Sequence, residues 1–266
     1  MSGQLSEAAV AARLRAAGCV FAEDEARLIL GTAATPDDAS AMVERRAAGL
    51  PLEHVLGWAE FCGLRVAVDA GVFVPRRRTE FLVRRAAALA PPRPVVVDLC
   101  CGSGALGAAL VSELRAGGGE DGFVLHAADI EPAAVRCARR NLAPFGGHVH
   151  EGDLFAPLPP ALRGGIDLLL ANVPYVPAGE LALMPAEARE HEPRVALDGG
   201  ADGLDVLRRV TAEAPAWLAP GGQLLFETSE RQVPDAVAAV GRAGLAATVA
   251  ESEEFAAIVV IGAKPV

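Results

Sequence analysis

The sequence predicts an α/β fold in which helices cover both faces of a mostly parallel sheet. From residue 75 onward, short apolar runs alternate with amphipathic runs, which is the pattern of repeated strand–turn–helix units. Several of the short runs, such as "PVVVDL" at 94–99, are apolar throughout, as strands buried on both faces are. The 266 residues are 52% hydrophobic, so the chain can bury a large core.

Residues 1–56 differ from the rest because they contain only helical patterns. Three amphipathic runs each end at a glycine, namely Gly18, Gly31 and Gly49. The third run opens with Thr35 as the expected N-cap, and Asp38 follows at the spacing of a capping box. We interpret residues 1–56 as a small helical domain.

Residues 57–74, "GWAEFCGLRVAVDAGVFV", have a different pattern. Aromatic and branched side chains alternate around glycines, which indicates a β-hairpin. We expect this hairpin to link the helical domain to a second domain that covers residues 75–266.

The second domain is predicted to contain seven strands, at 94–99, 123–130, 148–155, 166–172, 221–228, 246–250 and 254–263. Helical runs separate most of them, at 105–114, 131–142, 203–218 and 232–244. The last two strands have no long crossover between them, so they are expected to form an antiparallel hairpin at one edge. The result is a Rossmann-like, seven-stranded, mostly parallel sheet.

Composition excludes several classes of function. The net charge is −10 and Lys264 is the only lysine, so the chain is not expected to bind nucleic acid on its own. The basic run at 75–85 is interpreted as a solvated helix face. The five cysteines include no CxxC pair, which predicts no metal site and a reducing compartment. With no signal-peptide pattern and no apolar run of about 20 residues, we expect a cytoplasmic protein with no membrane contact.

The turn after the first strand of the sheet, "DLCCGSGALG", indicates a nucleotide site. Gly102, Gly104 and Gly107 match the GxGxxG pattern of dinucleotide-binding turns. However, Asp98 precedes the turn, where its carboxylate would repel a pyrophosphate. S-adenosylmethionine has no phosphate and carries an ammonium and a sulfonium, so it suits this position better than NAD. The alternative is that these residues only shape a tight turn.

Further acids end the next two strands. Asp129 is expected to bind ribose hydroxyls under either interpretation, and Asp153 in "GDLF" to reach an adenine amino group. The predicted cofactor-binding residues are Asp98, Cys100, Cys101, Gly102, Ser103, Gly104, Asp129, Ile130, Asp153, Leu154 and Asn172.

These motifs together resemble a known family. "VVVDLCCGSGALG", "AADIEPAAVRCARRNL", "GDLF" and "NVPY" follow the order found in class I S-adenosylmethionine-dependent methyltransferases. "PLEHVLGWAEFCGLRVAVDAGVFVPRRRTEFLV", "EHEPRVALDGGADGLDVLRRV" and "LAPGGQLLFET" are similar to the protein-glutamine N5-methyltransferases of peptide-chain release factors. The resemblance runs from about residue 50 to the C-terminus. It implies methylation of a glutamine amide in a release factor or a related translation protein, recognised by residues 1–56.

The resemblance also assigns the catalytic residues, because the family's Asn-Pro-Pro-Tyr matches Asn172, Val173, Pro174 and Tyr175. An amide nitrogen is a poor nucleophile, since its lone pair is delocalised. The Asn172 side-chain oxygen and the carbonyl of residue 173 would accept its two N–H bonds and favour pyramidalisation. Pro174 would stiffen the loop, and the Tyr175 ring would pack on the amide. The structural alternative is that Asn172 caps a turn and Tyr175 fills the core.

Three departures from the family pattern involve four residues. Cys100 replaces a glycine, and its Cβ is expected to crowd the cofactor unless its φ is negative. Arg77 and Arg78 replace a Pro-acid pair, and Val173 replaces the first proline of the tetrapeptide. Two other functions therefore stay open: an N6-adenine methyltransferase of nucleic acid, and a non-catalytic paralogue that binds the cofactor. The sequence does not determine the oligomeric state.

Overall fold

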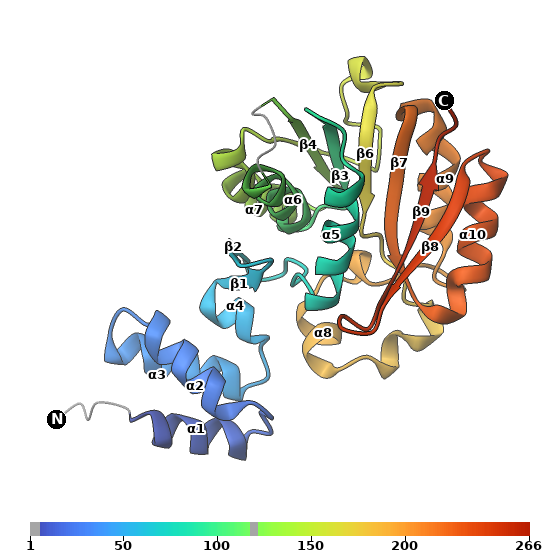
Figure 1. The fold of residues 1–266 in the computed structure, drawn as a ribbon. Helices are drawn as coiled ribbons and strands as arrows, with labels where there is room; N and C mark the ends of the chain where they lie inside the picture. The colour runs from blue at the N-terminus through green and yellow to red at the C-terminus, as the bar shows by residue number, and fades with distance from the viewer. Residues whose placement is uncertain (1–5, 118–121) are drawn as a thin grey trace.

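The computed structural model describes residues 6–117 and 122–266, which form a helical unit and a larger α/β unit joined by a short hairpin (Figure 1). In the helical unit, the described elements are α1 (Glu7–Ala16), α2 (Ala22–Thr32), α3 (Pro36–Ala47) and α4 (Leu52–Leu56). They enclose a small core of their own, to which each helix contributes, with Leu14, Ile29, Met42 and Val55 among its members. No helix in the described ranges has the length and apolarity needed to cross a membrane.

Local hydrogen bonds define where these helices begin. Ser6 caps α1 by accepting from the Ala9 N–H at 3.3 Å, and Thr35 caps α3 by accepting from the Asp38 N–H at 3.1 Å. The Asp38 carboxylate accepts from the Ala34 N–H at 3.0 Å, one residue before the position that a capping box uses.

The connecting hairpin is shorter than the sequence predicts. Strands β1 (Trp58–Phe61) and β2 (Leu64–Ala67) pair antiparallel and form a separate two-stranded sheet. Cys62 and Gly63 occupy the turn with φ of 49° and 73°, the left-handed conformation of a tight hairpin turn. Residues 68–74 are not strand, because the chain turns there toward the α/β unit.

The α/β unit contains the expected seven-stranded sheet, with strand order β5-β4-β3-β6-β7-β9-β8. Its strands are β3 (Val95–Leu99), β4 (Val124–Asp129), β5 (His148–Glu151), β6 (Ile166–Ala171), β7 (Leu218–Thr228), β8 (Ala246–Ser252) and β9 (Ala257–Ala263). The first five are parallel, and β9 and β8 run antiparallel at one edge. The third predicted strand, at 148–155, ends at Glu151.

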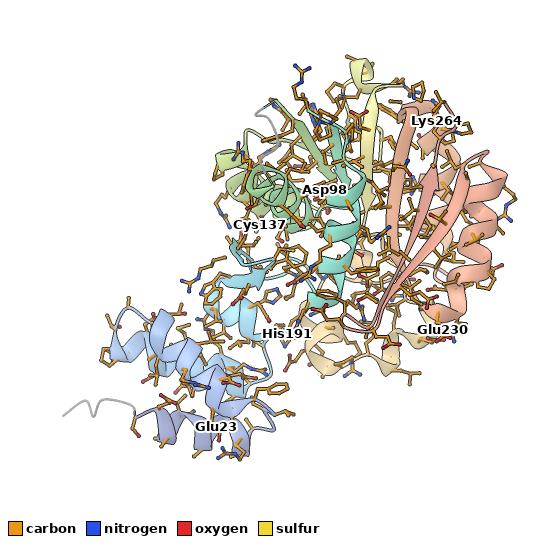
Figure 2. All side chains as sticks on the ribbon, viewed as in Figure 1. Glu23, Asp98, Cys137, His191, Glu230 and Lys264 are labelled. Atoms are coloured by element: carbon orange, nitrogen blue, oxygen red, sulfur yellow. The ribbon has the colours of Figure 1, made fainter. Side chains whose placement is uncertain are left out.

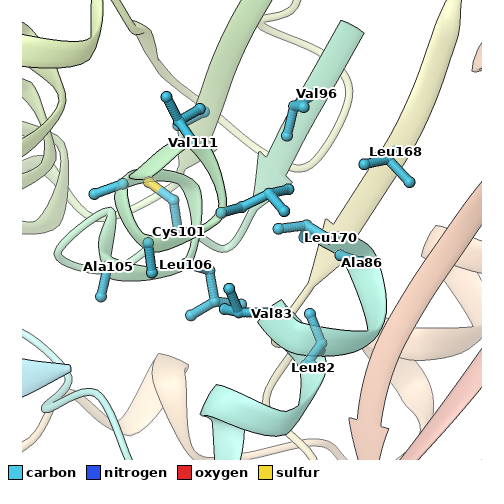
Figure 3. Packing of buried hydrophobic residues seen from close by; sticks show 14 of the residues in the cluster. Leu82, Val83, Ala86, Val96, Cys101, Ala105, Leu106, Val111, Leu168 and Leu170 are labelled. Carbon is cyan, nitrogen blue, oxygen red and sulfur yellow. The ribbon is translucent and has the colours of Figure 1, made fainter. Parts of the chain in front are cut away.

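Alternation along the strands gives the sheet two apolar faces. Val96 and Leu170 face α5 (Glu80–Leu89), α6 (Ala105–Ala116) and α7 (Pro132–Leu142), as Figure 3 shows for part of this cluster. Val97 and Leu169 face the opposite layer, which is formed by α9 (Asp205–Trp217) and α10 (Val233–Arg242). Because β3 to β7 are parallel, their carboxyl ends lie together at the same end of the strands. In an open α/β sheet, ligands bind at this end.

Helix α5 is only partly the solvated face expected for the basic run at 75–85. Its Leu82 and Val83 are fully buried against the sheet, whereas the Arg84 side chain is 52% exposed. The basic residues just before it, at 76 and 78, belong to the site.

Candidate active site

The turn after β3 has the geometry of a ligand-binding turn. The Cys101 N–H donates to the Ala128 carbonyl at 3.1 Å, which joins the turn to β4. Gly104 has φ of 78° and precedes α6, and a Cβ there would lie 3.0 Å from Leu142 Cγ. Glycine is therefore required at 104 for both backbone conformation and close packing. Ser103 is buried, and its carbonyl accepts from Asn141 Nδ2 at 2.8 Å.

Asp129, at the end of β4, organises this turn. Its Oδ2 accepts from the Gly102 N–H at 2.8 Å, and its Oδ1 accepts from the Glu131 N–H at 2.9 Å. Burial raises the pKa of Asp129, and the two backbone N–H groups oppose that effect. Each oxygen keeps a second lone pair, and because Asp129 lines the cavity, a ribose hydroxyl is a suitable donor to it. The neighbouring Ile130 is 49% exposed and also lines the cavity.

Asp98 lies behind the turn and does not line the cavity that contains Asp129. It is fully buried, its Oδ2 accepts from the Gly107 N–H at 3.0 Å, and its Oδ1 has no hydrogen-bond partner among the residues that the structure describes. Burial raises the pKa of this carboxyl to about 7, and the nearby Asp129 raises it further against the effect of the Gly107 N–H. Its predicted contact with the cofactor remains a prediction.

Cys100 adopts the strained conformation that the sequence analysis identified as unfavourable. A negative φ would have kept its Cβ away from the cofactor, but the φ of Cys100 is 54°. Cys100 also lines the cavity. Burial raises the pKa of the Cys100 thiol, and Asp129 and Asp98 raise it further. A thiol in this environment is not a nucleophile.

Asp153 lies apart from this cavity. Its carboxylate forms an ion pair with Arg209 of α9, and both side chains are about half exposed, at 48% and 53%. The adjacent Leu154 is buried with φ of 48°. A contact between Asp153 and adenine would therefore compete with Arg209, and the assignment stays a prediction.

The cavity occupies the carboxyl edge of the sheet. Its volume is about 100 Å³, and about 780 Å³ when the open solvent at its mouth is included. Its lining includes Cys100, Gly102 and Asp129 together with Asn172 to Tyr175. The cofactor turn and the Asn172 loop thus meet in one site, as the sequence predicts. Among the described residues, no cluster of His, Cys, Asp or Glu is arranged to hold a metal ion.

Asn172 begins the loop after β6 with its carboxamide unused. In residues 6–117 and 122–266, no group hydrogen-bonds to its side chain or to the Val173 carbonyl. Asn172 is half-buried, and Val173 is buried in the core below it. Both predicted acceptors therefore lack a partner within the described residues and belong to residues that line the cavity, and no hydrogen bond there makes Asn172 the cap of a turn.

Tyr175 is held at its hydroxyl group by Glu227 and Arg78, two contacts that the sequence alone does not predict. Its O–H donates to Glu227 Oε1 at 2.9 Å, and Arg78 donates to the Tyr175 oxygen while pairing with Glu227 at 2.7 Å. The Thr79 hydroxyl donates to the other Glu227 oxygen at 2.8 Å. Burial raises the pKa of Tyr175 and the Glu227 charge raises it further, so the phenol stays protonated. Glu227 comes from the end of β7, so the strand-end rule applied to "FET" could have identified it.

S-adenosylmethionine fits the residues present at this site. The two arginines in the cavity, Arg76 and Arg78, are already paired with Glu192 and Glu227, whereas Asp98 and Asp129 at the turn have no cationic partner. A pyrophosphate there would meet the uncompensated carboxylate of Asp129, which lines the cavity, but an ammonium or a sulfonium would be stabilised. Gly102 and Asp129 are the residues that would hold the nucleoside.

Comparison with known proteins also indicates an S-adenosylmethionine-dependent enzyme. No family model matches the chain. It is 37% identical over 260 residues to the release factor glutamine methyltransferase of Deinococcus radiodurans, covering 90% of each chain. It is 38% identical over 209 residues to that of Geobacter sulfurreducens, covering 76% of this chain and 69% of the relative. A methyltransferase structure from Pyrococcus furiosus has the same fold, with a TM-score of 0.57 at 14% identity over 86% of this chain and 100% of its own.

The fold, the cavity and these relatives define an S-adenosylmethionine-dependent methyltransferase. The chain is an enzyme with this cofactor. Within that class, it belongs to the release factor glutamine methyltransferase family.

Proposed function

We propose that the enzyme transfers a methyl group to the side-chain amide nitrogen of a glutamine in a release factor. The observation that carries this proposal is the pair of unused acceptors at the cavity, the Asn172 carboxamide oxygen and the Val173 carbonyl. A primary amide offers two N–H donors, so two acceptors on one loop suit it. The names of the relatives supply the protein class.

The acceptors act on the reactivity of the substrate nitrogen. S-adenosylmethionine supplies an electrophilic methyl group when bound. Hydrogen bonds from the two N–H groups to Asn172 and Val173 orient the nitrogen lone pair and favour its pyramidal form. As the N–C bond forms and the C–S bond breaks, the amide proton becomes acidic and passes to water, so no strong base is needed. Tyr175, fixed by Glu227 and Arg78, packs beside the planar amide.

The helical unit, residues 1–56, is proposed to recognise the protein substrate. It exposes Val20 and Phe21 between α1 and α2, at 84% and 68%, so these two apolar side chains are available to a protein partner. The proposed place of action is the cytoplasm, where release factors work and where the five free thiols stay reduced.

A methylation assay tests the function. Purified enzyme, tritiated S-adenosylmethionine and a bacterial release factor are combined, and the labelled residue is located by mass spectrometry. We expect the label on one glutamine, and none on a release factor in which that glutamine is replaced by alanine. Label on nucleic acid in a lysate, with none on the release factor, would instead identify an adenine methyltransferase. Cofactor binding without any transfer would identify a non-catalytic paralogue.

A further inference from the structure

Part of the cavity lining comes from residues 177–197, which we call the wall segment. It contains η4 (Ala178–Leu183), α8 (Ala186–His191) and η5 (Arg194–Ala196), and it contributes Met184 and Val195 to the cavity lining. In Figure 1, α8 lies on the side of the α/β unit that faces the helical unit, and Figure 2 places His191 in the same region.

The two ends of the wall segment are tied together beside the Asn172 loop. The Val176 N–H donates to the Leu197 carbonyl at 3.0 Å, and the Gly199 N–H donates to the Val176 carbonyl at 2.9 Å. Gly199 permits this approach, because a Cβ there would lie 2.7 Å from the Pro174 carbonyl oxygen. The base of the segment is therefore fixed to the catalytic loop.

Packing alone does not fix the rest of the segment. Its only buried apolar side chains are Ala188 and Leu197, and Leu183 is 82% exposed. A segment with so little buried apolar surface has a low local stability. Specific polar contacts must therefore determine the position of the wall segment.

Two ion pairs with buried partners supply such contacts. Glu192, whose side chain is fully buried, pairs with Arg76 at 2.6 Å and accepts from the Val74 N–H at 3.2 Å. Glu187 on α8 pairs with Arg46 of α3 at 2.7 Å, a contact across 141 residues of sequence. The contacts of Glu192 connect the wall segment to Val74 and Arg76, which follow the hairpin. The Glu187–Arg46 pair connects the wall segment to the helical unit.

Contacts within the helical unit fix the side chain of Arg46 independently of Glu187. Its side chain is 7% exposed and binds Glu25 through two nitrogens, at 2.6 and 3.1 Å. The nitrogen that contacts Glu187 also donates to the Leu50 carbonyl at 2.9 Å. The planar guanidinium is thus preorganised by the core of the helical unit and offers α8 one fixed position.

We propose that Glu187 is a positioning residue. Through the ion pair between Glu187 and Arg46, the helical unit determines the position of the wall segment, and therefore the shape of the cavity beside the Asn172 loop. This inference rests on the proposed function, since it concerns the side of the cavity where the glutamine-bearing segment would enter. It gives the helical unit a second role beside substrate recognition. Removing the Glu187 carboxylate frees α8 but leaves the Arg46–Glu25 pair intact, so the helical unit stays folded.

The test uses the full-length enzyme with Glu187→Ala and Glu187→Gln, and with Glu190→Ala as the matched control. Glu190 lies on the same helix but pairs only with its neighbour Arg189, on the surface. We measure kcat and KM for the release factor, cofactor affinity by calorimetry, and hydrogen exchange of the α8 amides. For Glu187→Ala we expect KM to rise about tenfold with kcat and cofactor affinity nearly unchanged, the scale for losing a hydrogen bond to a charged group. Exchange at α8 should accelerate.

Glu187→Gln keeps an acceptor oxygen without the charge, so its KM and exchange should lie between those of the wild type and the alanine variant. Wild-type KM and exchange in Glu187→Ala, or equal effects in Glu190→Ala, would overturn the positioning role. The proposed function fails separately, if the wild-type enzyme itself does not label the release factor.

Discussion

Replacement of Asn172 by alanine separates catalysis from folding, because the structure leaves its side chain without an internal partner. No hydrogen bond within the described ranges is lost in this variant, and the side chain is only half-buried. We therefore expect the melting temperature to stay within about 2 °C of wild type, as for surface substitutions. Loss of one preorganised acceptor is expected to slow methyl transfer about a hundredfold, or roughly 3 kcal/mol, by analogy with oxyanion-hole donors.

Single-turnover transfer to the release factor, at saturating cofactor, measures this effect directly. Asn172→Asp keeps an oxygen acceptor and is expected to retain part of the activity. Asn141→Ala is the matched structural control, because Asn141 accepts from the Ala67 N–H and donates to the Ala67 and Ser103 carbonyls. Its loss should lower the melting temperature by several degrees, since buried groups are left unpaired.

A wild-type transfer rate in Asn172→Ala would refute the catalytic role. The same conclusion would follow if Asn172→Ala lost as much stability as Asn141→Ala, because the rate loss would then reflect unfolding. Unchanged affinity for S-adenosylmethionine in calorimetry completes the expected pattern.

Three further outcomes concern residues in or behind the turn that follows β3 and at the end of β4. Asp129→Ala should weaken S-adenosylmethionine binding by roughly 1.5–3 kcal/mol in calorimetry, since it removes a charged acceptor and frees the Gly102 and Glu131 N–H groups; unchanged affinity would contradict the assignment. Cys100→Gly relieves a φ of 54° and should raise the melting temperature by about 2–4 °C without loss of cofactor binding; a lower value would show that the thiol's packing outweighs the strain. The Asp98 pKa, raised from 3.8 to about 7, means that its contribution to stability is complete below about pH 4 and is lost as the pH rises toward 7. Denaturant titrations of the cofactor-free enzyme from pH 4 to 8 should therefore show that Asp98→Asn removes a decline on the order of 4 kcal/mol, and parallel curves for the two proteins would exclude this role.

The sequence by itself determined the elements and the place of the site. Val96 and Val97 pack on opposite faces of the sheet because successive side chains of a strand alternate, and this consequence of strand geometry is local. Parallel strands bring their carboxyl ends to one edge, so the turn at Gly102 and the loop at Asn172 meet although 70 residues separate them.

Only the tertiary structure decided how the site residues are held. Tyr175 depends on Glu227, 52 residues later, and on Arg78, 97 residues earlier. The wall of the cavity depends on Arg46 in a separate helical unit, and the φ of 54° at Cys100 depends on the turn that Asp129 organises. These contacts join charged or polar side chains that show no periodicity. The packing of the units determines which acids and arginines pair. A buried charge is costly without a partner, and the fold decides which partner lies within reach.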